Sequence, residues 1–260
     1  MVLRPRLPHS GFAQTEDSDW MPLLPQVLDR SLISSLTLFD RMGPAELDDV
    51  LSEAASARCE RGEVLFEQGW EADHFYLLLH GRLRITQVTA EGQQIIVRMV
   101  NPGDLFGIAK ALQRLDYPGT ATAAADSVVL RWPMDAWVGM LDRHPAFAVN
   151  TMQVIGSRLQ EAHTRLREMS TEAVERRVGH AVLRLVSQSG RKEDHGIRID
   201  FPISRQEIAE MTGTTLHTVS RILSAWESAG IVDAGRQKLL VKDPHRLLLI
   251  ADGLSAGMLR

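Results

Sequence analysis

The sequence predicts an α+β fold in which an antiparallel β-roll comes first, a long helix follows, and two short helices with a hairpin come last. Three observations support this fold class. Short apolar runs separated by glycines fill residues 60–132, an apolar stripe of helical period starts near Pro145, and two short amphipathic segments meet at Gly213. Because the spacing of apolar residues changes from strand-like to helix-like along the chain, we expect the strands and the helices to form separate units.

Length and composition narrow the class of protein. A chain of 260 residues suits two domains, each with its own core. It contains no apolar run near the roughly 18 residues of a membrane span and no apolar segment of a signal peptide, so we expect a cytoplasmic protein without a membrane partner. The one cysteine, Cys59, excludes an internal disulfide and also a zinc site or iron–sulfur cluster held by several thiolates.

Charge is divided unevenly along the chain. The net charge is −4, but residues 171–260 hold 13 Lys and Arg against 11 Asp and Glu, which leaves the acidic excess in residues 1–170. The C-terminal part therefore has the sign of charge expected for a nucleic-acid-binding domain.

The N-terminal half begins with a proline-containing stretch and then becomes strand-like. Residues 1–30 carry four prolines among polar residues and are expected to form an arm. A helix with proline in its first turn is expected from Pro44. Strand-like pieces with glycines between them follow at 64–66, 74–79, 83–86, 94–100 and 128–132. Several short strands with regularly spaced turn residues indicate an antiparallel roll or barrel.

From Pro145 the apolar residues repeat in steps of three and four. The stripe consists of Met152, Ile155, Leu159, Ala162, Leu166 and Met169. It can pack against the chain's own roll or against a partner helix. Because the stripe is narrow and the helix is long, we favour a parallel homodimer with these residues in its interface.

The C-terminal part predicts a helix at 171–187, a polar turn at 189–196, a short strand at 197–200 and then the two short helices. Ser204 and Glu207 form a capping-box pattern at the first short helix, and Thr214 or Thr215 can cap the second. One face of the second helix is apolar, with Leu216, Val219, Ile222, Leu223 and Trp226. The opposite face carries no acid and consists of Thr214, His217, Ser220, Arg221 and Ser224.

This polar face has the side chains that read DNA. Arginine can bind guanine O6 and N7 with both arms, and serine or threonine can contact base edges or phosphates. A helix-turn-helix places the N-terminal part of its second helix in the major groove. An ordinary helical hairpin with a polar solvent face is the alternative, and we favour DNA binding. The hairpin expected after residue 231 carries Arg236 and Lys238 near its tip. This tip is either a wing that contacts DNA phosphates or a solvated turn.

The order of roll, long helix and winged helix-turn-helix resembles the Crp/Fnr superfamily of bacterial transcription regulators. The motifs that carry the resemblance are RGEVLF at 61–66 with Gly69, AD at 72–73, YLL at 76–78 with Gly81, NPGDLFG at 101–107, and the helices at 203–223. The resemblance implies a cyclic-nucleotide-binding-like jelly roll at 31–143, a dimerisation helix at 144–170 and a winged helix-turn-helix DNA-binding domain at 171–250. The arm at 1–30 and a tail at 251–260 flank these parts.

The resemblance also bears on the effector. Family members that bind cyclic nucleotides follow the glycine of 106–107 with a glutamate and set an arginine before a serine or threonine for the phosphate. Here Ile108 or Ala109 stands at the glutamate position and Gly119 precedes Thr120. Because a buried phosphate needs a cation or a helix N-terminus, cyclic AMP is not expected. The oxygen sensors of the family hold an iron–sulfur cluster on several cysteines, which Cys59 alone excludes. Candidate effector-pocket residues are Gly107, Lys110, Tyr117 and Thr120.

The recognition string at 212–224 and the YPGTA segment at 117–121 are similar to the NnrR-type regulators of nitrite and nitric oxide reduction. This likeness implies control of denitrification or nitric-oxide-response genes, and it allows haem as a cofactor. Candidate haem ligands are His163, His80, His74 and His144, although a histidine on a helix face is more often a surface residue. A regulator without a small ligand and one that responds to a cyclic nucleotide are the alternatives.

By resemblance, Arg221 binds guanine and Ser220 lies beside a thymine, while His217 stands where relatives carry a glutamate. The other candidate DNA contacts are Ser204, Arg205, Gln206, Thr214, Thr215, Arg236 and Lys238. Two copies related by a dimer axis imply double-stranded DNA with an inverted repeat, and the family implies RNA polymerase as a further partner. No hydrolase, metalloprotease, P-loop or dinucleotide motif occurs, so neither an enzyme nor a metal site is expected.

Overall fold

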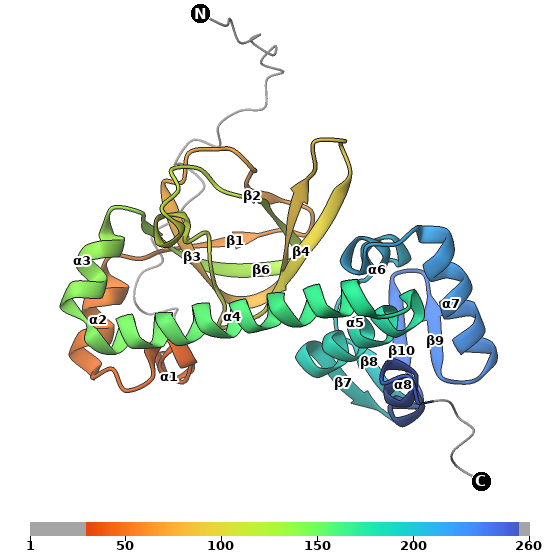
Figure 1. Ribbon diagram of the computed structural model, residues 1–260. Helices are drawn as coiled ribbons and strands as arrows, with labels where there is room; N and C mark the ends of the chain where they lie inside the picture. The colour runs from red at the N-terminus through yellow and green to blue at the C-terminus, as the bar shows by residue number, and fades with distance from the viewer. Residues whose placement is uncertain (1–29, 255–260) are drawn as a thin grey trace, which may run out of the picture.

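The computed structural model describes residues 30–254, which form two domains joined by one long helix (Figure 1). It confirms the α+β fold class, with an antiparallel β-roll followed by helices and a winged helix-turn-helix. The N-terminal arm expected at 1–30 lies outside the described residues except for Arg30, which begins helix α1, Arg30–Ser34. Most of the expected tail at 251–260 lies outside them too.

The roll begins with short helices and continues as one antiparallel sheet. A 3-10 turn, Thr37–Phe39, and helix α2, Pro44–Ser52, come first. The strands are β1 Ala55–Cys59, β2 Val64–Phe66, β3 His74–Val88, β4 Gln94–Val100, β5 Leu105–Phe106 and β6 Thr120–Pro133, with a 3-10 turn at Ala109–Leu112. Their main order is β1-β6-β3-β4, with β2 on β6 and β5 on β3. The long pair β3 and β6 therefore forms the centre of the roll.

Three strand predictions were wrong in extent. The pieces at 74–79 and 83–86 are one strand, β3, because Gly81 forms a bulge within it instead of ending it. The piece at 128–132 is only the end of β6, since its first half is rich in alanine and threonine and lacks a strong apolar alternation. Strand β1 was missed because ASARC contains no large apolar residue.

Aromatic side chains fill the interior of the roll. Trp132 is fully buried, and its indole Nε1 donates to the carbonyl of Val50 at 2.7 Å, so it ties β6 to α2. The ring of Phe75 stacks on Trp132 with 5.4 Å between centroids. Burying such rings supplies much of the free energy that stabilises a small roll.

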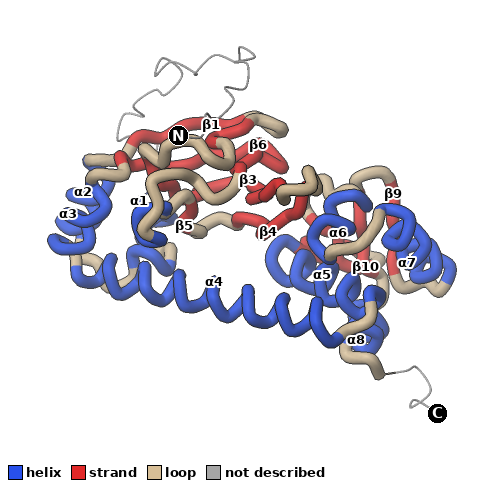
Figure 2. Tube along the Cα trace, turned by 45° about the horizontal axis from the view of Figure 1, so that its top comes forward, coloured by secondary structure: helices blue, strands red, loops and turns tan. Residues whose placement is uncertain are grey.

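Helix α3, Ala136–Arg143, leads into α4, Pro145–Thr171, which extends from the roll to the second domain. Figure 2 shows α4 along one side of the molecule, reaching from α3 to the vicinity of α5 and α8. At its N-terminal end, buried Asn150 donates to the carbonyls of Leu38 and Asp40 at 3.0 and 2.8 Å. At its C-terminal end, buried Glu168 accepts two hydrogen bonds from Arg184 at 2.6 and 2.9 Å. The helix is thus anchored to both domains.

The C-terminal domain combines four helices and a four-stranded sheet. Its elements are α5 Val174–Ser189, β7 Gly190–Glu193, β8 Gly196–Ile199, α6 Arg205–Thr212, α7 Leu216–Ser228, β9 Val232–Gly235, β10 Lys238–Val241 and α8 Pro244–Ala251. The strand order is β7-β8-β10-β9. The polar turn predicted at 189–196 was wrong, because this segment pairs through its backbone as the β7–β8 hairpin while its side chains stay exposed.

The helix-turn-helix is built by the local signals expected from the sequence. The Ser204 hydroxyl accepts from the Glu207 backbone N–H at 3.1 Å, and a Glu207 carboxylate oxygen accepts from the Ser204 N–H at 2.7 Å, which completes the capping box. Gly213 ends α6 in the left-handed region with φ 60, where glycine is favoured. Thr215, not Thr214, caps α7 by accepting from the Thr218 N–H at 3.2 Å.

Replacing Ser204 with alanine is expected to lower the free energy of unfolding by about 1 kcal/mol, because the Glu207 N–H loses its capping partner. Urea denaturation followed by circular dichroism measures this change. Ser228→Ala is the control, since this exposed hydroxyl only bonds back to the Ser224 carbonyl within α7. Equal losses in the two variants would contradict a capping role for Ser204.

None of the helices within residues 30–254 has the length and apolar character needed to cross a membrane.

Candidate nucleic-acid interface and effector site

Helix α7 presents the polar face that the sequence predicts for DNA recognition. His217, Arg221 and Ser224 are exposed, and Ser220 and Thr214 are half-buried beside them. The opposite face is buried at Val219, Ile222, Leu223 and Trp226. Leu216, predicted on the same apolar face, lies in the first turn of α7 and is 46% exposed.

Arg221 is free to contact a ligand. Within residues 30–254 its guanidinium forms no hydrogen bond and no ion pair, and the side chain is exposed. Figure 1 shows α7 on the outer side of the domain, with α6 between it and the roll. An unpaired arginine on an accessible helix, among hydroxyls and an imidazole and without an acid, has the chemistry needed to bind a guanine edge.

The other DNA-contact candidates fall into two groups. Ser204, Arg205 and Gln206 open α6, where the Ser204 hydroxyl serves the cap and Arg205 donates to the Ala234 carbonyl at 3.3 Å. Arg236 and Lys238 lie exposed at the tip of the β9–β10 hairpin. The fold therefore brings a helix N-terminus, a recognition helix and a basic hairpin tip into one domain, the parts from which phosphate and base contacts are made.

Helix α6 packs against the roll, which the sequence does not reveal. Arg84 of β3 lies 2.7 Å from Glu207 of α6, and both side chains are mostly buried. Arg61 donates to Gln237 of the hairpin at 3.0 Å. Ser204 and Gln206 line a depression of 530 Å³ together with these roll residues. A DNA backbone that contacts the start of α6 would therefore also lie against these residues of the roll.

The apolar stripe of α4 is largely uncovered within the chain. Met152, Leu159, Leu166 and Met169 are 63%, 56%, 64% and 51% exposed, Ala162 is exposed, and Ile155 is half-buried. Exposed apolar side chains in one row along a helix are the pattern of a surface that packs on a partner.

An ion network, also hidden in the sequence, fastens α4 to the roll. Arg158 of α4 binds Asp104, and Arg98 of β4 donates to the Leu105 carbonyl at 3.1 Å. Burial lowers the pKa of Arg98 to about 10, so it stays charged at neutral pH. Glu161 accepts from Arg158 at 3.0 and 3.1 Å. The sequence offered one partial signal, since Asp104 belongs to the NPGDLFG turn, where its carboxylate accepts from the Asn101 N–H at 2.8 Å.

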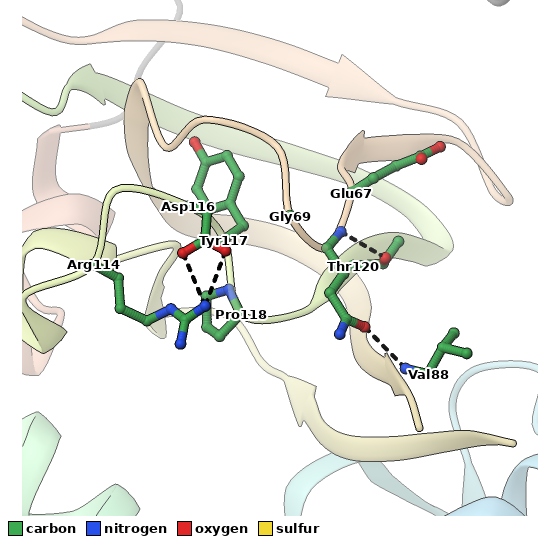
Figure 3. A pocket seen from close by; sticks show the side chains of 9 residues that line it. Glu67, Gly69, Val88, Arg114, Asp116, Tyr117, Pro118 and Thr120 are labelled. Atoms are coloured by element: carbon green, nitrogen blue, oxygen red, sulfur yellow. Dashed lines mark hydrogen bonds and ion pairs between the residues drawn. The ribbon is translucent and has the colours of Figure 1, made fainter. Parts of the chain in front are cut away.

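The structure separates the four effector-pocket candidates. Tyr117 and Thr120 line a depression of 430 Å³ beside Arg114 and Asp116, as Figure 3 shows. Gly107 lies elsewhere, against the ring of Tyr76, and Lys110 is exposed and lies 3.1 Å from Asp135.

Tyr117 has a clear structural role. Its ring stacks on Phe66 with 3.9 Å between centroids, and its hydroxyl donates to the His74 carbonyl at 2.7 Å. Burial raises the pKa of Tyr117 above its ordinary value, so the hydroxyl keeps its proton for this bond. Thr120 accepts from the Gln68 N–H at 3.0 Å, which also fixes the loop.

The four candidate haem ligands lie apart. His74 Nδ1 is 2.9 Å from Asp73, and His144 Nε2 is 2.8 Å from Asp49, whose pKa is lowered by this hydrogen bond. His80 and His163 are exposed on β3 and α4. No cluster of three or more His, Cys, Asp or Glu that could hold a metal occurs among the described residues. The second ring nitrogen of His74 and of His144 stays available, as in many ligating histidines, but neither residue lines the 430 Å³ depression of the roll.

Comparison with protein families matches both halves of the chain. The model of the family described as "Cyclic nucleotide-binding domain" matches residues 57–144, and that of "Crp-like helix-turn-helix domain" matches residues 176–250. The first match falls on the roll and the second on the domain that contains α7.

Known proteins of similar sequence are transcription regulators, not enzymes. The "Cyclic AMP receptor protein" of Thermus thermophilus is 30% identical over 218 residues, which cover 84% of this chain and 98% of that protein. The "Global nitrogen regulator" of Synechocystis is 26% identical over 225 residues, covering 85% and 98%. The structure of FixK2 from Bradyrhizobium japonicum is similar in fold, with a TM-score of 0.67 at 21% identity over 76% of this chain and 96% of that one.

Proposed function

We propose a specific role from the premise that this chain belongs to the Crp/Fnr family of DNA-binding transcription regulators. It acts as a homodimer that binds an inverted-repeat operator and controls denitrification or nitric-oxide-response genes, with RNA polymerase as its partner at the promoter. The observation that carries the DNA-binding part is the unpaired, exposed Arg221 on the acid-free face of α7.

The dimer part of the proposal is supported by the exposed stripe of α4. A parallel pair of α4 helices places the two copies of α7 about a two-fold axis, so the two half-sites form an inverted repeat. Half-sites about one helical turn apart follow from this symmetry.

The gene class is supported by the recognition string at 212–224 and the segment at 117–121, which are similar to NnrR-type regulators. Genome-wide occupancy of the protein in its own host, grown anaerobically with nitrate, tests it. We expect inverted repeats upstream of nitrite or nitric oxide reductase genes to be occupied. Occupancy confined to promoters of carbon or nitrogen assimilation genes would overturn the denitrification role and leave the DNA-binding role intact.

The effector acts without a haem held by these histidines. His74 and His144 each have one ring nitrogen beside a carboxylate, and neither residue lines the 430 Å³ depression of the roll. His80 and His163 are exposed. The absorption spectrum of the protein, titrated anaerobically with haem and then with nitric oxide, is expected to show no saturable Soret band. A stoichiometric band that shifts with nitric oxide, and that disappears when one of these four histidines is replaced by alanine, would refute this prediction.

Cyclic AMP is not the effector either. A Cβ at Gly119 would lie 2.8 Å from the Thr86 carbonyl oxygen, so the position before Thr120 has no room for the phosphate-binding arginine of cyclic-nucleotide relatives. A buried cyclic phosphate would lack that cation. Titration with cyclic AMP and with cyclic GMP tests this proposal, and we expect no saturable binding of either nucleotide. A regulator that responds to a cyclic nucleotide would bind one of them saturably.

A further inference from the structure

A further cavity, partly open to solvent, lies between the two domains, and its lining includes neither the polar face of α7 nor α4. It has a volume of 570 Å³. The roll contributes His80, Arg82 and Asn101, and the C-terminal domain contributes Arg191 and the 200–201 segment, among other lining residues. Its walls therefore come from both domains.

Arg82 lies in the wall of this cavity without a bonded anionic partner among the described residues. The residue is 8% exposed, and within residues 30–254 its guanidinium forms no hydrogen bond and no ion pair. Its Nε is buried without a partner, and its Cζ lies 5.0 Å above the ring of Phe201. Burial lowers the pKa of Arg82, and the charges of Asp104 and Asp200 partly oppose this. A buried cation without a bonded partner is costly unless a ligand supplies the anion.

The backbone holds Arg82 firmly in this position. Gly81 has φ 89, and a Cβ there would lie 2.3 Å from the Asp126 carbonyl oxygen and from Ser127 Oγ, so only glycine fits the bulge. Ser127 Oγ then accepts from the Arg82 N–H at 3.1 Å. The side chain is thus presented to the cavity by a bulge within strand β3 and not by a loop.

The surrounding polar groups define the ligand chemistry. The Oδ1 of Asn101 is buried without a partner and can accept from a hydroxyl or an amine. The two lining acids are already engaged: Asp200 lies 3.4 Å from Arg191 and Asp126 accepts from the Arg61 N–H at 3.0 Å. Arg82 is therefore the buried cation of this cavity that lacks a bonded carboxylate within residues 30–254.

We propose that this interdomain cavity binds a small anionic metabolite, with its phosphate or carboxylate paired to Arg82 and a hydroxyl or amine donating to Asn101. A guanidinium binds both kinds of anion through two parallel hydrogen bonds. Since the ligand touches both domains, its binding favours the domain arrangement seen here. The binding itself does not depend on the proposed DNA function.

Isothermal titration of the full chain with inorganic phosphate and, separately, with succinate tests the proposal at constant ionic strength in chloride. We expect one saturable site per chain for at least one of the two anions, and the anion that binds identifies the ligand class. Arg82→Met should weaken this binding at least about tenfold, because the guanidinium supplies the charged hydrogen bonds. Arg58→Met, which removes an exposed arginine from β1, is the matched control and should leave binding unchanged.

Arg82→Lys covers the case in which Arg82→Met does not fold, as judged by circular dichroism. It keeps the charge but loses the planar fork, so several-fold weaker binding is expected. The proposal is overturned if neither anion binds saturably, or if the folded Arg82 variant binds as tightly as the unaltered chain. Neither result would count against operator binding by α7, because Arg82 lies in the roll and not on the recognition helix.

Discussion

Replacing Leu159 with aspartate is expected to abolish dimerisation and to weaken operator binding about 10²–10⁴-fold, the advantage that two linked half-site contacts provide. Leu159 lies in the middle of the α4 stripe and is 56% exposed in the single chain. In a helix pair it becomes buried, and two aspartates facing each other across the seam would repel and lose their hydration. Sedimentation or light scattering measures the oligomeric state, and fluorescence anisotropy with an operator duplex measures affinity.

Gln160→Asp provides the matched control for this change. Gln160 is exposed and lies on the adjacent face of α4. Its replacement by aspartate adds the same charge as Leu159→Asp, and it should leave the dimer and the operator affinity intact. Helical content by circular dichroism should stay the same in both variants, because neither residue is buried within the chain. A Leu159→Asp protein that is still dimeric would remove the stripe from the interface.

Replacing Arg221 with alanine is expected to cost about 1–3 kcal/mol of operator binding, roughly a 5- to 150-fold loss, and to abolish discrimination at one base pair. The side chain is exposed and unpaired within residues 30–254, so its removal leaves no buried group without a partner. Anisotropy titrations with the operator, with a duplex changed at one guanine and with random DNA measure the effect.

Arg236→Ala is the informative comparison, because it removes the same charge from the hairpin tip. A phosphate contact carries no sequence information, so binding to specific and random DNA should weaken by similar factors and the salt dependence should become shallower. If Arg221→Ala behaves in this uniform way too, Arg221 contacts a phosphate and not a guanine.

The apolar stripe of α4 and the DNA-binding domain are in direct contact. A Cβ at Gly213, in the turn between α6 and α7, would lie 2.5 Å from the Met169 methyl carbon at the end of the stripe. Glu168 beside it holds Arg184 of α5. A shift of one α4 helix against its partner would therefore move residues that touch the helix-turn-helix turn. An effector can use this contact only if it binds the two arrangements with different affinity.

Features that depend on neighbouring residues could be read from the sequence. The capping box at Ser204, the turn at Gly213 and the two faces of α7 each involve residues a few positions apart. The same holds for the stripe of α4, since one helical period places its members in a row. These signals are local, so the sequence by itself determined the fold class and the candidate recognition surface.

Features that join distant residues were decided only by the tertiary structure. Arg84 and Glu207 are 123 positions apart, yet they pair and bring the start of α6 against the roll. Arg82 reaches Phe201 across the two domains, and Gly107 and Lys110 are separated from Tyr117 and Thr120. In the sequence, nothing distinguishes the mostly buried charged residues Arg82, Arg84 and Glu207 from charged residues on the solvated surface. Which of them becomes buried depends on the packing of whole domains, because no local pattern encodes contacts between segments so far apart.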